Sequence, residues 1–196
     1  MMKKRRFMND KGYTLVEMII VIAIVAVLAG AAMATLSILS TARVKESSTT
    51  FYAEINSLRS RAMHEIPSYD ADHDGVIDDS EKDNTLFHDI KLHKDGKRIY
   101  AKMSVSDDGS TDLGVDVIGN LNGGKGTSLS TYPEIYYTPY VGARSQILVN
   151  DTDSHVIIFN KTGECIKGYG TYEFCKKNGS VIATVTIKKN GSCQIK

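Results

Sequence analysis

The sequence predicts an α+β fold in which one long N-terminal helix packs on a small antiparallel β-sheet domain. Two observations predict the helix: residues 18–42 carry no charge, and an apolar stripe at helical spacing follows them. A third predicts the sheet, because short segments rich in β-branched and aromatic residues alternate with glycine turns from residue 97 onward. With 196 residues, the chain has material for one ordinary domain plus an appendage.

The first half of the predicted helix, residues 13–42, is apolar enough to cross a membrane. Its 25 uncharged residues would span about 38 Å, against roughly 30 Å of hydrocarbon in a bilayer. By the positive-inside bias, the basic residues before it keep the N-terminus cytoplasmic; these are Lys3, Lys4, Arg5, Arg6 and Lys11. We therefore expect a single-pass protein of the cell membrane, with its C-terminal domain extracytoplasmic.

The second half of the helix, residues 43–66, is predicted to be amphipathic. Its apolar positions recur at intervals of seven, four, three, four and four residues, which places them on one helix face: Val44, Phe51, Ile55, Leu58, Ala62 and Ile66. Pro67 should end the helix, which would then run from about Tyr13 to Ile66.

The C-terminal β domain, residues 97–196, is expected to cover that apolar face. Strands are predicted at residues 97–105, 145–150, 155–159, 170–175 and 180–188, and a flexible loop between residues 118 and 131. The acidic residues 67–96 are interpreted as an insertion between the helix and this domain.

Glu17 stands almost at the start of the apolar run, where a charge costs insertion energy and is functional by default. A basic leader, then Gly12, Tyr13, Thr-Leu-Val and Glu17, precedes about twenty apolar residues. This order resembles the type IV prepilins and type II secretion pseudopilins, whose leader is cut after the glycine by prepilin peptidase. The resemblance implies that residues 1–12 are removed and that the new amine of Tyr13 is methylated.

The same resemblance implies a structural subunit that assembles with other pilin or pseudopilin subunits through its membrane helix. Glu17 would pair with the Tyr13 ammonium of an adjacent subunit, since a charge in a low-dielectric core needs a partner. The strand and turn rhythm of residues 155–196 is similar to the H-type minor pseudopilins and minor pilins (the GspH/FimT group). The expected location is therefore a pilus or a secretion or competence pseudopilus.

The chain departs from the family pattern in two places. Tyr13 replaces the phenylalanine that is usual at the first mature position, and the span has no proline before Pro67. Gly30 could supply local weakness in the helix instead.

The stretch DADHDGVIDDSE, residues 70–81, fits a twelve-residue EF-hand-like calcium loop. Oxygen ligands are expected at the first, third, fifth, seventh, ninth and twelfth positions, with glycine at the sixth; these ligands are Asp70, Asp72, Asp74, the Val76 carbonyl, Asp78 and Glu81. The sequence therefore predicts calcium as a cofactor, although a solvated acidic insertion would have the same composition.

Three cysteines lie in the last 32 residues, on the side of the membrane where disulfides can form. A Cys165–Cys175 bridge is preferred because the short separation suits adjacent strands. Cys175–Cys193 and three buried reduced thiols both remain open.

Two other classes of protein remain open. One is a secreted or membrane-anchored calcium-binding module; the secreted form would be cleaved at the A-x-A signal of residues 32–34 and would begin at Thr35. A DNA-binding minor pilin would contact phosphates through Lys188 and Lys189. The sequence shows no catalytic set of residues, so we do not expect an enzyme.

Overall fold

The computed structural model describes residues 13–68, 78–107, 125–131 and 133–196. It contains two compact units, Met1–Leu39 and Ser40–Lys196. One helix, α1 (Leu15–His64), contributes residues to both units, and its bounds lie within two residues of those predicted. The long N-terminal helix is therefore confirmed.

In the first unit, α1 exposes its apolar side chains on all sides. Residues such as Ile20, Ile24 and Leu28 are more than half exposed, and the most apolar 18-residue window of the helix has no part buried in protein. A helix of this length and composition fits a membrane-anchored protein.

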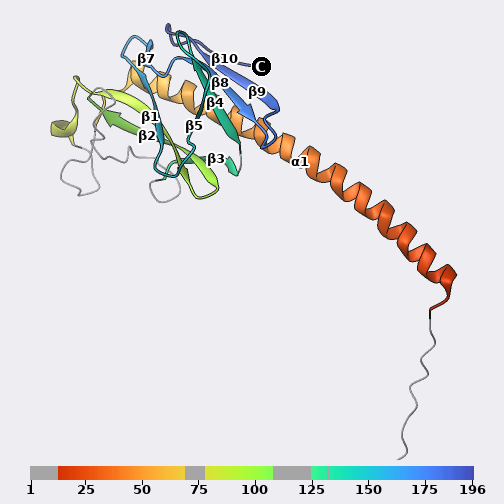
Figure 1. The fold of residues 1–196 in the computed structure, drawn as a ribbon. Coiled ribbons are helices and arrows are strands. Elements are labelled where there is room, and N and C mark those ends of the chain that lie inside the picture. The colour runs from red at the N-terminus through yellow and green to blue at the C-terminus, as the bar shows by residue number, and fades with distance from the viewer. Residues whose placement is uncertain (1–12, 69–77, 108–124, 132) are drawn as a thin grey trace, which may run out of the picture. The chain divides into compact units, whose positions relative to one another are not determined.

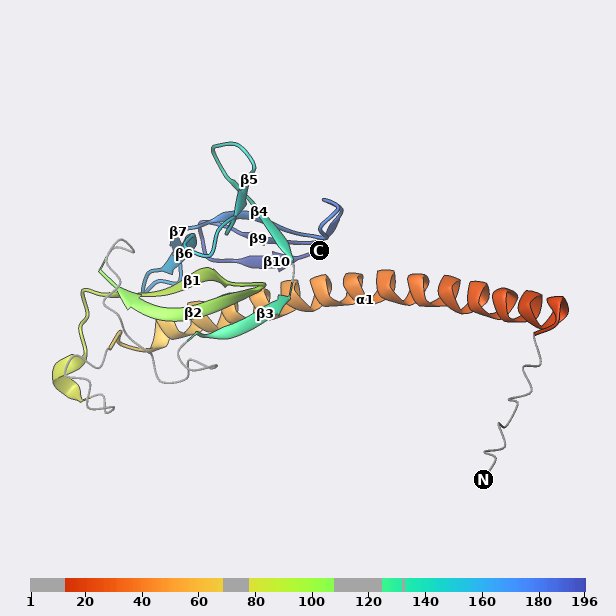
Figure 2. The same ribbon diagram turned by 60° about the horizontal axis from the view of Figure 1, so that its bottom comes forward.

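The second unit pairs its strands antiparallel in two five-stranded sheets, where a single small sheet was predicted. Sheet one has the order β3-β2-β1-β6-β7, and sheet two has the order β10-β9-β8-β4-β5. Figures 1 and 2 show the second half of α1 beside both sheets. The strands are β1 (Phe87–Asp95), β2 (Arg98–Ser106), β3 (Thr127–Thr131), β4 (Glu134–Pro139), β5 (Ser145–Ile147), β6 (Ser154–Phe159), β7 (Cys165–Lys167), β8 (Gly170–Cys175), β9 (Val181–Ile187) and β10 (Cys193–Ile195).

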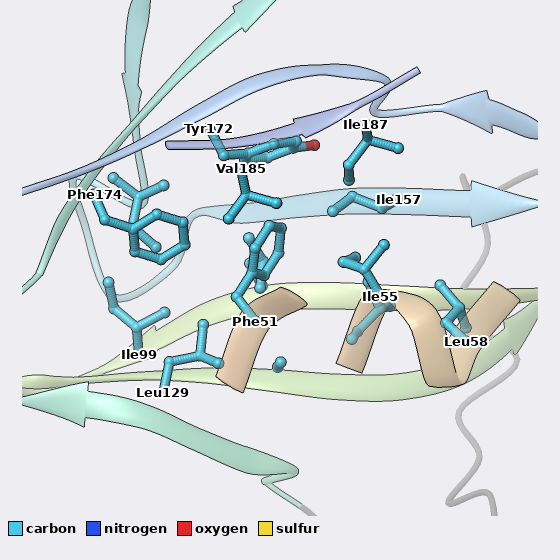
Figure 3. Packing of buried hydrophobic residues seen from close by; sticks show 14 of the residues in the cluster. Phe51, Ile55, Leu58, Ile99, Leu129, Ile157, Tyr172, Phe174, Val185 and Ile187 are labelled. Atoms are coloured by element: carbon cyan, nitrogen blue, oxygen red, sulfur yellow. The ribbon is translucent and has the colours of Figure 1, made fainter. Parts of the chain in front are cut away.

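The core lies between the apolar face of α1 and the two sheets. Phe51, Ile55 and Leu58 point from the helix toward side chains of both sheets (Figure 3). The Phe51 ring lies 5.0 Å from that of Tyr172 and 5.4 Å from that of Phe174. The predicted stripe holds from Val44 to Ala62, but Ile66 is 48% exposed because the helix has ended two residues earlier.

The boundary of the predicted insertion, residues 67–96, is wrong at its C-terminal end. Phe87–Asp95 forms β1, which pairs with β2 on one side and β6 on the other, so it is the central strand of sheet one. The sequence pattern does not show this strand, because the buried residue Asp89 is polar. Its carboxylate accepts a hydrogen bond from Ser104 Oγ. The insertion is therefore shorter than the sequence suggests.

The predicted loop between residues 118 and 131 is also wrong at its end, because Thr127–Thr131 forms edge strand β3. The short strands β7 and β10 agree with the hairpin and the final strand–turn–strand that the rhythm of residues 155–196 indicated.

A polar network crosses the interior of the second unit. Tyr172 Oη donates to the Gly168 carbonyl at 2.5 Å, and His155 Nε2 lies 2.9 Å from Tyr172 Oη. Burial, with a smaller contribution from Lys167, lowers the pKa of His155 to about 4. The ring is therefore neutral near pH 7, and its Nε2–H donates to the tyrosine.

Candidate processing and assembly site

The first turn of α1 holds the residues that the sequence singled out for processing and assembly. Tyr13 precedes the helix and is 83% exposed, whereas Gly12 lies outside the described residues. Glu17 Oε2 accepts hydrogen bonds from Thr14 N at 2.8 Å and from Thr14 Oγ1 at 2.9 Å. Glu17 N donates in return to Thr14 Oγ1 at 3.2 Å.

This reciprocal pairing is a capping box, in which the side chain of the N-cap and that of the third helical residue satisfy each other's backbone N–H. Negative charge in the first turn is also favoured by the helix dipole. The signal, threonine followed three residues later by glutamate, stands in the sequence at Thr14 and Glu17 but was not recognised. Glu17 therefore has a role within its own chain, in addition to the contact between subunits that its position suggests.

Most of the predicted calcium ligands, Asp70, Asp72, Asp74 and Val76, lie outside the described residues. Asp78 is described: its Oδ1 accepts hydrogen bonds from Ser80 N at 2.7 Å and from Ser80 Oγ at 2.5 Å. Glu81 ends a short 3-10 helix, η1 (Asp79–Glu81). Across the described ranges alone, no group of His, Cys, Asp or Glu forms a metal cluster.

The chain segments on either side of the predicted calcium loop lie next to each other. Ser68 and Lys82 form an isolated antiparallel bridge, and Asp83 N donates to the Pro67 carbonyl at 2.9 Å. The chain that enters the predicted calcium loop is thus fastened to the chain that leaves it.

All three cysteines are free in the structure, and the strand positions do not fit the preferred disulfide, Cys165–Cys175. Cys175 lies opposite Val181 at one end of β9, and Cys193 lies opposite Ile187 at the other end. Six residues of strand separate these positions by about 20 Å, whereas a disulfide needs Cα atoms within about 7 Å.

The position of Cys165 completes this correction. Its N–H donates to the Lys189 carbonyl at 2.9 Å, just beyond the Ile187 end of β9. Cys165 is therefore also distant from Cys175, and the geometry excludes both bridges that involve Cys175.

Lys188 and Lys189, the residues suggested for DNA, lie in the turn between β9 and β10, closed by a hydrogen bond from Lys188 N to the Ser192 carbonyl at 2.9 Å. The next lysine pair, Lys176 and Lys177, lies in the turn between β8 and β9. The two lysine pairs therefore lie at opposite ends of β9.

Comparison with known proteins gives one match. The family model of the prokaryotic N-terminal methylation motif matches residues 7–33, which contain Gly12, Tyr13, Glu17 and the first part of the apolar helix. No curated protein and no solved structure matches the chain significantly. The match supports a prepilin-like N-terminus of the kind that prepilin peptidase cleaves.

Proposed function

We propose that this protein is a minor pilin or pseudopilin subunit of the H type (GspH/FimT-like), assembled into a type IV pilus or into a secretion or competence pseudopilus. The observation that carries the subunit role is the methylation motif at residues 7–33, which includes the start of the apolar helix and Glu17 in its first turn. The H type is proposed from the strand and turn rhythm of residues 155–196. The globular unit that follows helix residue 39 would form the outer part of the filament.

Assembly would use the exposed apolar part of α1. The peptidase cuts after Gly12, and the new Tyr13 ammonium then stands directly before the capping box of Thr14 and Glu17. Side-by-side packing of such helices removes their first turns from water. In the low-dielectric interior between the helices, an unpaired carboxylate is strongly unfavourable. Pairing of Glu17 with the Tyr13 ammonium of a neighbour would therefore fix the axial register between subunits.

The mature N-terminus distinguishes this proposal from a secreted module. Intact-mass analysis of the protein purified from membranes should give a chain that begins at Tyr13 and carries one added methyl group. An Ala34→Leu variant serves as the matched control, because it destroys the A-x-A signal but leaves the prepilin motif unchanged. A mature chain that starts at Thr35, or loss of processing in this control, would contradict the proposal.

We also propose that residues 70–81 bind calcium. The support is the ligand spacing together with the fastened ends, because the Ser68–Lys82 bridge brings together the chain segments on either side of the loop. Hard cations require several oxygen ligands, and closely spaced carboxylates repel one another until a divalent ion compensates their charge. The ion would compensate the charge of the carboxylates in this loop.

Calorimetric titration with calcium tests the site. We expect one site with a dissociation constant of roughly 10⁻⁴ to 10⁻³ M, typical of extracellular modules. Glu81→Gln should weaken binding about tenfold or more, because it removes the negative charge and one of the two carboxylate oxygens at the twelfth position. His73→Ala is the matched control at a non-ligand position and should bind as the unaltered chain does. Equal affinity of the Glu81→Gln variant and the unaltered chain would rule out this site.

A further inference from the structure

Cys165 in β7 of sheet one and Cys193 in β10 of sheet two both lie near the Ile187 end of β9. Cys165 N donates to the Lys189 carbonyl, and the tight turn that follows Lys189 leads directly into Cys193. The backbones are in contact nearby, because a Cβ on Gly191 would lie 1.7 Å from the Gly163 carbonyl oxygen. Both glycines have a φ of 78°, which L side chains rarely adopt, so this close approach depends on glycine at both positions.

Both thiols also face the core. Cys193 lies opposite Ile187, and residues opposite each other in an antiparallel pair share one face of the sheet. Ile187 is fully buried, so the Cys193 side chain is directed inward, where it packs against the core cluster that contains Cys165. Burial is the main cause that raises the pKa of Tyr172, and Tyr137, Cys165 and Cys193 make smaller contributions.

We propose that Cys165 and Cys193 form a disulfide in the exported protein and that Cys175 remains a thiol. This bond would join β7, an edge strand of sheet one, to β10, an edge strand of sheet two. It would thus link the two sheets covalently. The link would lie on the side where Arg59 Nε donates to the Gly163 carbonyl at 3.1 Å. The inference takes only its oxidising compartment from the proposed function, because the pairing itself rests on the fold.

The chemistry is thiol–disulfide exchange. Each cysteine loses its S–H proton, one S–S bond forms, and two electrons pass to a disulfide-containing oxidant that leaves as two thiols. Burial raises the pKa of Cys165 to about 12 and that of Cys193 to about 11, so little thiolate exists in the folded reduced chain. The bond should therefore form while the chain folds, before the sandwich closes over Cys165.

Peptide mapping after oxidative refolding tests the pairing. The purified full chain is refolded in detergent with a mixture of oxidised and reduced glutathione, and then digested with trypsin without reduction. Trypsin separates the cysteines into three peptides, TGECIK (162–167), GYGTYEFCK (168–176) and NGSCQIK (190–196). We expect the first and third peptides to be linked and the second to carry a free thiol.

Thermal unfolding provides a second measurement. Reduction should lower the melting temperature by about 5–10 °C in the unaltered chain and in Cys175→Ser, the matched control. Cys193→Ser should show no dependence on reductant. Three free thiols after refolding, or any link that contains Cys175, would overturn the proposal. Because this refolding does not depend on export or on cleavage after Gly12, its failure would leave the proposed function intact.

Discussion

Replacing Glu17 with glutamine should lower the fraction of subunits in filaments by about a hundredfold or more, while the protein still inserts in the membrane. Glutamine keeps the capping box with Thr14 but removes the charge that would pair with the Tyr13 ammonium of a neighbour. Loss of one partner of a buried ion pair costs about 3–5 kcal/mol, and each 1.4 kcal/mol is a factor of ten. Immunoblots that compare sheared filaments with the membrane fraction measure the effect.

Two further variants separate the charge of Glu17 from its capping role. Thr14→Ala removes the N-cap side chain, costs about 1 kcal/mol of helix stability and should reduce assembly only modestly. Glu17→Leu removes both the cap and the charge and should fail to assemble as Glu17→Gln does. If Glu17→Gln assembled normally while Glu17→Leu and Thr14→Ala failed, the capping box alone would explain Glu17, and pairing between subunits would be wrong.

Replacing Phe51 with alanine should destabilise the second unit by about 3–5 kcal/mol, because the fully buried ring packs against Tyr172 and Phe174 and its removal leaves a cavity. The melting temperature should fall by about 10 °C or more. Near-ultraviolet circular dichroism of the full chain in detergent follows the loss of packing around the tyrosines.

Ser57→Ala is the matched control for this variant, since Ser57 is exposed on the same helix. Exposed substitutions usually change the free energy of unfolding by less than about 0.5 kcal/mol. Equal melting temperatures for Phe51→Ala and Ser57→Ala would show that the helix does not form part of the core.

The helix could be predicted from the sequence almost completely, because a period of 3.6 residues and a long uncharged run are strong local signals. The strands centred on Tyr100, Ile157, Phe174 and Val185 were also recognised, since their residue types favour extended structure. Strand β1 was not recognised, because the face opposite Ile90 and Leu92 carries the buried Asp89, whose Oδ1 accepts a hydrogen bond from Ser104 on another strand. Local patterning cannot show that the partner, Ser104, will lie opposite.

The site divides in the same way. Gly12, Tyr13 and Glu17 form a contiguous motif that can be read directly, and the later motif match covers all three. The cysteines could not be paired from their spacing, because proximity depends on which end of β9 each one reaches. Cys165 and Cys175 are close in sequence, yet β8 runs along the sheet and carries Cys175 away from the end where Cys165 lies.

The Ser68–Lys82 bridge has a consequence for the evolution of this domain. The bridge holds the two ends of the intervening segment together. The entropic cost of closing this loop is therefore part of the folding free energy of the globular unit, and it changes only slowly with loop length. A segment with joined ends can be exchanged for one of different length or ligand chemistry with little change in folding free energy. If the segment between Ser68 and Lys82 binds calcium as proposed, its ligands could change during evolution without a change in the residues of the core.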